Sequence, residues 1–344
     1  RSTYATFMKV RFYKFRGILQ MSMNIHLLAI ITTLSVGSML GADHNKSKTK
    51  PLYAKVAPAC LEILVGGRLD GSATIVSKEG LVLTACHVIR KKSKRYEALS
   101  PTLGRHPLKL VCTDRSHDLA LLSLPKRETP YPFLPIAKNI PNEGRPSYLF
   151  GAPVFRHNLL ITGYVAKKKS SFEWYDGAFA ETFAIAGIGA GGTSGGPWLN
   201  ARGEIIGVQV ASMTLGEVHQ GIASAIPPTA IRSLIEKKLT VVTTTMQAAV
   251  EEIWGQSPEF LEKIKPNTKG LLLRQVAKGG VAAKVGLKDE EIILKVGGKR
   301  IFERIEPFMQ MLRRKKPGDT LLLHIADSKG EGERAVKIKL AELK

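Results

Sequence analysis

Between residues 52 and 228 the sequence is a succession of short β-prone runs separated by Gly, Asn and Pro. The runs are CLEILVGG, GSATIVS, GLVLTACHVI, LKLVCT, DLALLSL, NLLITGYVA, FAETFAIAG and GEIIGVQVAS. Many short strands with turn residues between them are typical of an all-β barrel or sandwich. SKEG before Leu81 and NARG before Glu204 predict hairpin turns. A proline-rich stretch, residues 125–137, divides this β region into two halves.

The rest of the chain is organised differently. After Pro227 and Pro228, apolar residues recur at helical spacing (Ile231, Leu234, Ile235 and Leu239), which predicts one helix that closes the β region. Residues 245–344 mix helical and strand patterns around apolar runs of their own, which indicates a smaller separate unit. A chain of 344 residues is long enough for two or three domains with separate cores.

The first 50 residues have the pattern of a targeting segment followed by a flexible linker. A basic stretch from Lys9 to Arg16 precedes an apolar run, residues 25–42, which ends in small residues before the polar DHNKSKTK. This order is typical of a secretory signal. Two alternatives stay open: an uncleaved membrane anchor at residues 25–42, and a mistranslated upstream extension. The first two interpretations place the folded part outside the cytoplasm, in the periplasm or cell envelope or secreted.

The formal net charge is +22, which favours polyanionic partners in general. The basic clusters are scattered and lack interleaved aromatic residues, so we expect solvated loop charges and no nucleic-acid partner. Three cysteines, Cys60, Cys86 and Cys112, cannot form a disulfide framework, although a bridge from Cys86 to either of the others stays open. The eight histidines show no metal-ligand spacing, and no cofactor or metal is expected.

The stretch AGGTSGGPWLN, residues 190–200, fits two unrelated catalytic signatures around Ser194. One is the nucleophile elbow of α/β hydrolases, for which Asp289 and His324 follow in the required order. That turn needs a helix after the serine, whereas two glycines, a proline and a hairpin pattern follow Ser194. The other is the order His, Asp, Ser, supplied by His87, Asp118 and Ser194, each beside an apolar strand.

The motifs GSATIVSKEGLVLTACHVI, DLALL, GTSGGPWLNARGEIIGV and GIASAIP together resemble the trypsin-like peptidases of the HtrA/DegP family. The resemblance implies a mostly β fold: two six-stranded barrels of chymotrypsin type at residues 51–240, and a small α+β PDZ domain at residues 245–344. It implies a serine endopeptidase that acts on unfolded or damaged proteins in the cell envelope. It also implies a homo-oligomer, with a trimer as the suggested form. The alternative is a catalytically weak protease fold that acts as a chaperone or scaffold.

In this resemblance Ser194 is the nucleophile, His87 its base and Asp118 the partner that orients His87, as in the Ser-His-Asp mechanism. The backbone N–H groups of Gly192 and Ser194 would form the oxyanion hole. Ile188, Val210 and Ala211 would line the specificity pocket, and an apolar Ile188 predicts cleavage after small or medium aliphatic residues.

The third unit resembles a PDZ core through residues 270–301, GLLLRQVAKGGVAAKVGLKDEEIILKVGGKRI. A PDZ domain binds the C-terminal end of a peptide as an added strand and holds its carboxylate on backbone N–H groups. The loop expected to hold the carboxylate, TMQAAVEEI at residues 245–253, contains no glycine. A C-terminal peptide ligand and a degenerate PDZ that serves as a spacer or interaction surface are therefore both open.

Overall fold

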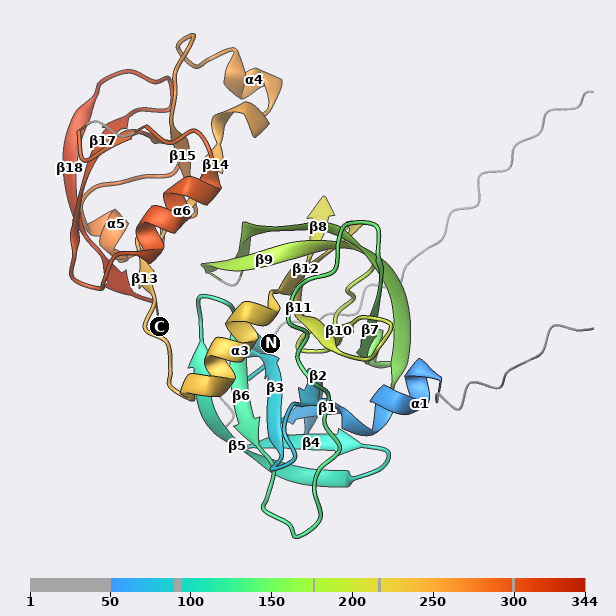
Figure 1. Cartoon of the computed structure of the whole chain (residues 1–344). Helices are drawn as coiled ribbons and strands as arrows, with labels where there is room; N and C mark the ends of the chain where they lie inside the picture. The colour runs from blue at the N-terminus through green and yellow to red at the C-terminus, as the bar shows by residue number, and fades with distance from the viewer. Residues whose placement is uncertain (1–50, 90–94, 176, 216–217, 299–300, 344) are drawn as a thin grey trace, which may run out of the picture. The chain divides into compact units, whose positions relative to one another are not determined.

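The computed structural model describes residues 51–89, 95–175, 177–215, 218–298 and 301–343, all within one unit that spans residues 50–344 (Figure 1). The targeting segment predicted at residues 1–50 lies outside these ranges. No helix within them is long and apolar enough to cross a membrane.

Six antiparallel strands close the first barrel in the order β1-β2-β3-β6-β5-β4 (Figure 1). They are β1 (Cys60–Val65), β2 (Arg68–Ile75), β3 (Leu81–Ala85), β4 (Tyr96–Ser100), β5 (Gly104–Asp114) and β6 (Leu119–Ser123). The short helices α1 (Leu52–Val56) and η1 (Ala57–Ala59) precede β1, and α2 (Cys86–Ile89) continues β3. Strands β1 and β6 are buried over most of their length because they line the barrel core.

The second half of the β region forms another closed ring, in the order β10-β11-β12-β9-β8-β7. Its elements are β7 (Pro146–Gly151), η2 (Pro153–Phe155), β8 (Leu159–Tyr175), β9 (Ala178–Ala186), β10 (Pro197–Leu199), β11 (Ile205–Leu215) and β12 (Val218–Ile226). Trp198 is fully buried in its core, and its Nε1 donates to Gln209 Oε1 at 2.7 Å. The indole therefore fills the barrel while its single polar group keeps a partner.

The two predicted hairpin turns and the closing helix are confirmed. Gly80 and Gly203 end the turns with φ of +89° and +77°, values that favour glycine. Helix α3 (Pro228–Lys237) buries Ile231 and Leu234 against the core that includes the first barrel.

A five-stranded antiparallel sheet forms the C-terminal part, in the order β14-β15-β16-β17-β18. The strands are β14 (Ala249–Glu252), β15 (Leu271–Arg274), β16 (Ile292–Val296), β17 (Thr320–Ala326) and β18 (Arg334–Lys339). The helices are η3 (Ile253–Gly255), α4 (Pro258–Leu261), α5 (Val281–Lys284) and α6 (Ile305–Arg313); β13 (Thr244–Thr245) pairs with β19 (Ala341–Glu342). Phe308 and Leu312 of α6 pack into a core with Leu271 and Leu323 of the sheet.

The mostly β fold is confirmed, and the nucleophile elbow is wrong. Strand β10, not a helix, follows Ser194. Asp289 and His324 lie in the C-terminal sheet unit with other partners: Asp289 Oδ1 accepts from Val276 N at 2.7 Å, and His324 Nδ1 lies 2.8 Å from Glu333 Oε1. All three cysteines are buried, and no disulfide joins any two of them, so the bridge from Cys86 to Cys60 or Cys112 is absent.

Candidate active site

His87 and Asp118 meet because the turn before β6 lies against the end of β3. Cys86 N donates to Asp118 O at 2.8 Å, and His87 N donates to Asp118 Oδ1 at 2.8 Å. The side chains are joined by His87 Nδ1 and Asp118 Oδ2 at 2.5 Å. An ionised carboxylate only accepts hydrogen bonds, so Nδ1 carries the proton and Nε2 is left as the basic nitrogen. The carboxylate is 8% exposed and the imidazole 26%, so the imidazole is the more accessible of the two groups.

Tyr175 is a further contact of Asp118 that the sequence analysis missed. Its hydroxyl donates to Asp118 Oδ2 at 2.9 Å, and its ring lies edge-on to the His87 imidazole with centroids 6.1 Å apart. Tyr175 ends β8, far from both residues along the chain, and no local pattern marks it. The contact therefore arises only when the two barrels are in place.

The segment that carries Ser194 is held against the first barrel. Ser72 N on β2 donates to Ser194 O at 2.8 Å, and Gly195 N donates to Gln209 O at 2.7 Å. A Cβ atom on Gly71 would lie 2.7 Å from Val88 Cγ2 and 2.8 Å from Ser194 O. Gly71 thus permits the close approach between the helix that carries His87 and the Ser194 segment. Ser194 Oγ has no hydrogen-bond partner within the part of the chain that the structure describes.

The loop before Ser194 contains Gly192, one of the two residues predicted to form the oxyanion hole, in a left-handed conformation. Gly192 has φ of +96°. Gly191 O accepts from Val154 N at 2.7 Å, and Gly192 O accepts from Ser72 Oγ at 2.8 Å. The backbone N–H groups of Gly192 and Ser194 have no hydrogen-bond partner among the described residues.

Of the predicted specificity residues, Ile188 is 57% exposed, Val210 is buried and Ala211 is half-buried. The space between the segment around Gly189 and β11 is filled by residues that the sequence analysis missed. Ser212 Oγ donates to Gly189 O at 2.5 Å, and Gln209 Nε2 donates to Ala211 O at 2.7 Å. A Cβ atom on Gly189 would clash with Gln209 Nε2 and would lie 2.7 Å from Ser212 Oγ, so these two polar side chains pack directly against Gly189.

A second histidine, His117, lies one residue before Asp118 in a charged cluster. Its Nδ1 lies 2.7 Å from Asp114 Oδ2, and its Nε2 lies 3.6 Å from Glu181 Oε2. Burial acts to lower the pKa of His117, but the hydrogen bonds to the two carboxylates prevail and the pKa is raised. Burial likewise opposes the charge of Asp114, yet its hydrogen bonds to His117 and Ser116 hold its pKa below the usual range.

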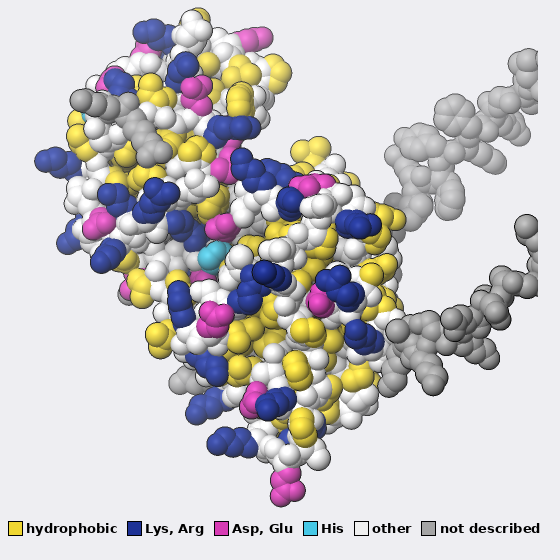
Figure 2. Space-filling model, viewed as in Figure 1, with side chains coloured by type: hydrophobic (Ala, Val, Ile, Leu, Met, Phe, Trp, Pro, Cys, Tyr) yellow, Lys and Arg dark blue, Asp and Glu magenta, His cyan; other side chains and the backbone are white. Residues whose placement is uncertain are grey.

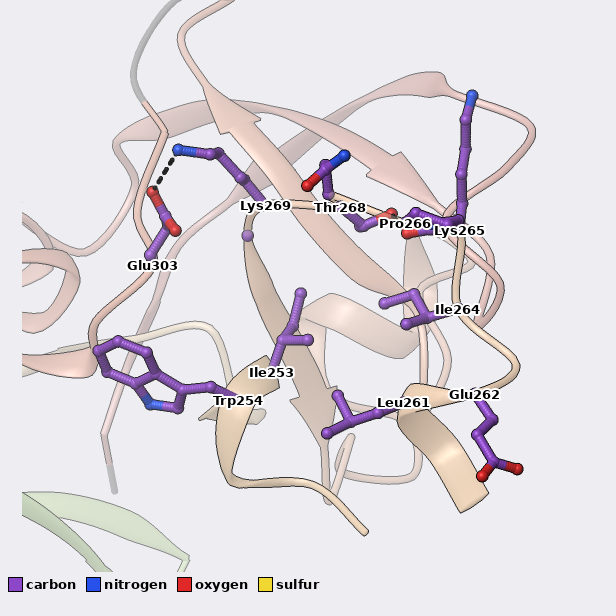
Figure 3. A pocket seen from close by; sticks show the side chains of 12 residues that line it. Ile253, Trp254, Leu261, Glu262, Ile264, Lys265, Pro266, Thr268, Lys269 and Glu303 are labelled. Carbon is purple, nitrogen blue, oxygen red and sulfur yellow. Dashed lines mark hydrogen bonds and ion pairs between the residues drawn. The ribbon is translucent and has the colours of Figure 1, made fainter. Parts of the chain in front are cut away.

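The C-terminal sheet unit contains a cavity of about 550 Å³ (Figure 3). Ile253, Trp254, Leu261 and Ile264 line its apolar side, and Lys269 Nζ pairs with Glu303 Oε1 at 3.3 Å on its rim (Figure 3). Over the described ranges, no group of three or more His, Cys, Asp or Glu side chains is placed to hold a metal ion. On the face shown in Figure 2, Lys and Arg side chains are dispersed among apolar and uncharged ones.

Comparison with known proteins supports the predicted resemblance. Residues 71–208 match the family model of the trypsin-like peptidase domain. The chain is 26% identical over 319 residues to serine protease HTRA1 of Xenopus tropicalis, covering 84% of this chain and 66% of that protein. It is 27% identical over 265 residues to a probable periplasmic serine endoprotease, DegP-like, of Chlamydia muridarum, covering 74% of this chain and 51% of that protein. The chain thus spans half to two thirds of the length of these relatives.

Two solved structures share the fold. The HtrA-type protease AlgW with a decapeptide matches with a TM-score of 0.57 and 19% identity, covering 86% of this chain and 98% of the other. The serine endoprotease from Yersinia pestis matches with a TM-score of 0.55 and 23% identity, covering 86% and 97%.

Proposed function

We propose that this chain, an HtrA-like serine protease by sequence and fold, is an endopeptidase that hydrolyses unfolded or damaged proteins with His87, Asp118 and Ser194. The contact between His87 Nδ1 and Asp118 Oδ2 is the observation that carries the proposal. It leaves Nε2 as the basic nitrogen, and the close approach of Val88 and Ser194 O around Gly71 supports placing the His87 helix near the Ser194 segment.

In the proposed mechanism Ser194 Oγ attacks the carbonyl carbon of the scissile bond while His87 Nε2 takes its proton. Asp118 holds the imidazole orientation and stabilises its positive charge. The C–N bond then breaks and His87 returns the proton to the leaving amine. Water, activated by His87, hydrolyses the acyl-enzyme and releases Ser194.

The negative oxygen of the tetrahedral intermediate would be bound by Gly192 N and Ser194 N. The unused state of both donors supports this role. In comparable enzymes, one such donor contributes about 3–4 kcal/mol to transition-state stabilisation. The apolar side chains of Ile188, Val210 and Ala211 support a preference for small or medium aliphatic side chains.

We propose that residues 51–240 form the protease domain and residues 245–344 a PDZ-like domain. Strand β14 is an edge strand of the C-terminal sheet, so an extended peptide could pair with it. Gln247, which precedes β14, adopts φ of +56°, a conformation that favours glycine. Gln247 N donates to Thr245 Oγ1 at 2.9 Å, so this N–H is not available to a carboxylate. This contact favours a general interaction surface over a receptor for a terminal carboxylate.

We propose an exported protein of the periplasm or cell envelope, secreted or anchored through residues 25–42, that works as a homo-oligomer. The name of the DegP-like relative, which calls it periplasmic, supports this location. Fractionation of cells that express the full chain tests the location, and light scattering tests the assembly, for which we expect a trimer.

Digestion of labelled casein by wild type and by Ser194→Ala tests the activity, together with a fluorophosphonate probe for the nucleophile. We expect cleavage and labelling by wild type only. A wild type that neither cleaves nor labels contradicts the proposed activity. In that case, suppression of casein aggregation by both proteins would favour the alternative, a chaperone or scaffold.

A further inference from the structure

Ser72 on β2 connects the loop that precedes the nucleophile to two other parts of the fold. Its side chain is 1% exposed, and its hydroxyl has two partners. Ser72 Oγ donates to Gly192 O at 2.8 Å and accepts from Ala152 N at 3.1 Å. Its backbone N–H donates to Ser194 O at 2.8 Å. One residue therefore contacts both proposed oxyanion-hole residues and the turn after β7.

The direction of the Gly192 N–H group depends on two peptide planes. In a trans peptide the C=O of one residue and the N–H of the next point in opposite directions. Val154 N holds Gly191 O, so the N–H of Gly192 points the other way. Ser72 Oγ holds Gly192 O and thereby fixes the plane on the other side of the Gly192 Cα atom. With both planes held, Gly192 stays at φ of +96° and its peptide does not flip.

The second hydrogen bond of the Ser72 hydroxyl, from Ala152 N, restrains the segment that contains Val154. Ala152 N donates to Ser72 Oγ. Ala152 lies two residues before Val154, whose N–H donates to Gly191 O. Val154 is β-branched and has φ of +48°, a conformation that such residues avoid. Val154 is 61% exposed, so its hydrogen bond to Gly191 O, rather than its own preference, holds this conformation. Loss of the hydrogen bond from Ala152 N to Ser72 Oγ would therefore weaken the restraint on Val154, whose N–H fixes the orientation of the Gly191–Gly192 peptide.

We infer that Ser72 is a positioning residue for catalysis, whose hydroxyl holds the Gly192 N–H group in the direction needed to bind the oxyanion. The inference rests on the proposed function, because it assigns a role in the same reaction. Ser72 touches neither the substrate nor the reacting atoms. Its loss should lower the rate of the acylation step and leave substrate binding in the ground state nearly unchanged.

The chain offers a matched control for removal of this hydroxyl. Ser147 on β7 is also fully buried, and its Oγ has no hydrogen-bond partner among the described residues. Ser147→Ala and Ser72→Ala each remove one buried hydroxyl from a strand. Only Ser72→Ala removes bonds to Gly192 and to Ala152. Ser72→Cys is a second test variant that fills the space but donates only weakly.

The experiment measures four quantities on the full chain. They are the rate of Ser194 labelling by a fluorophosphonate, kcat and KM on a fluorogenic peptide that wild type cleaves, and the melting temperature. In labelling, the Oγ–P bond forms, the P–F bond breaks, the serine proton passes to His87 and fluoride leaves. The phosphoryl oxygen uses the same two donors as the oxyanion, so labelling reports on the hole directly.

For Ser72→Ala we expect the labelling rate and kcat to fall about 10- to 100-fold, less than the 10²- to 10³-fold loss for a missing donor. The KM of Ser72→Ala should be unchanged. The labelling rate and kcat of Ser72→Cys should lie between those of wild type and Ser72→Ala, and those of Ser147→Ala should equal the wild-type values. Labelling of Ser72→Ala at the wild-type rate overturns the inference and leaves the proposed function intact. An equal loss in Ser147→Ala also overturns it, because any buried hydroxyl would then suffice. If Ser72→Ala does not fold, Ser72→Cys at full rate is the overturning result. A wild type that fails to label overturns the proposed function and, with it, this role.

Discussion

Gly71→Ala tests how closely the first barrel must approach the nucleophile segment. Gly71 does not need a left-handed backbone, so alanine alters only the space around it. The new Cβ would lie 2.7 and 2.9 Å from Val88 Cγ2 and Cγ1, and 2.8 Å from Ser194 O. Non-bonded carbon atoms prefer separations of about 3.5–4.0 Å, so the contacts with Val88 must open by about 1 Å.

This displacement would change the separation between the proposed catalytic residues His87 and Ser194. Ser194 O is a backbone atom and cannot rotate away, and Val88 follows His87 on α2. We therefore expect α2 and the Ser194 segment to separate. A misplacement of about 1 Å can cost about 10²-fold in rate. Overpacking of a buried position costs about 1–3 kcal/mol in the free energy of unfolding.

The assay compares kcat/KM on a fluorogenic peptide with the free energy of unfolding in urea. Gly255→Ala is the control, because a Cβ at Gly255 would have no neighbour within 4 Å. We expect activity to fall much further than stability in Gly71→Ala, and neither to change in Gly255→Ala. Wild-type activity in Gly71→Ala would refute the reasoning that this glycine sets the approach.

Three further predictions concern residues around the site. Tyr175→Phe should lower kcat about tenfold or more with KM unchanged, because a hydrogen bond to the Asp118 carboxylate contributes about 1.5–3 kcal/mol; unchanged kcat would show that Tyr175 does not orient Asp118. His117→Asn should lower the melting temperature most in mildly acidic solution. The pKa of His117 is raised on folding, so its stabilisation is fully present below its ordinary value of 6.5 and is lost as pH rises through the folded-state value. Melting curves from pH 5 to 9 check this, and a constant difference between the two proteins would contradict it. A peptide library should show cleavage after small or medium aliphatic residues, and a strong preference for Arg or Lys would contradict the role of Ile188.

The sequence indicated the β elements because they depend on local patterns. The turns that end at Gly80 and Gly203, the helix at α3 and most of the strands follow from turn residues and from the spacing of apolar residues. Strands β4, β7, β10 and β12 are absent from the β-prone runs of the sequence. Pairing with neighbours in the barrels, rather than their own composition, makes these segments strands.

The candidates His87, Asp118 and Ser194 came from the order of motifs along the chain, which needs no coordinates. The contacts that support these residues could not be predicted from the order of motifs. Ser72 and Gly192 are 120 residues apart in the sequence, and Tyr175 and Asp118 are 57 apart. Such pairs meet only when closed barrels bring distant strand ends together. The sequence by itself thus determined most of the strands of the β region and the candidate chemistry. The tertiary structure alone decided which side chains hold that chemistry in place, because hydrogen bonds between distant segments leave no periodic signal along the chain.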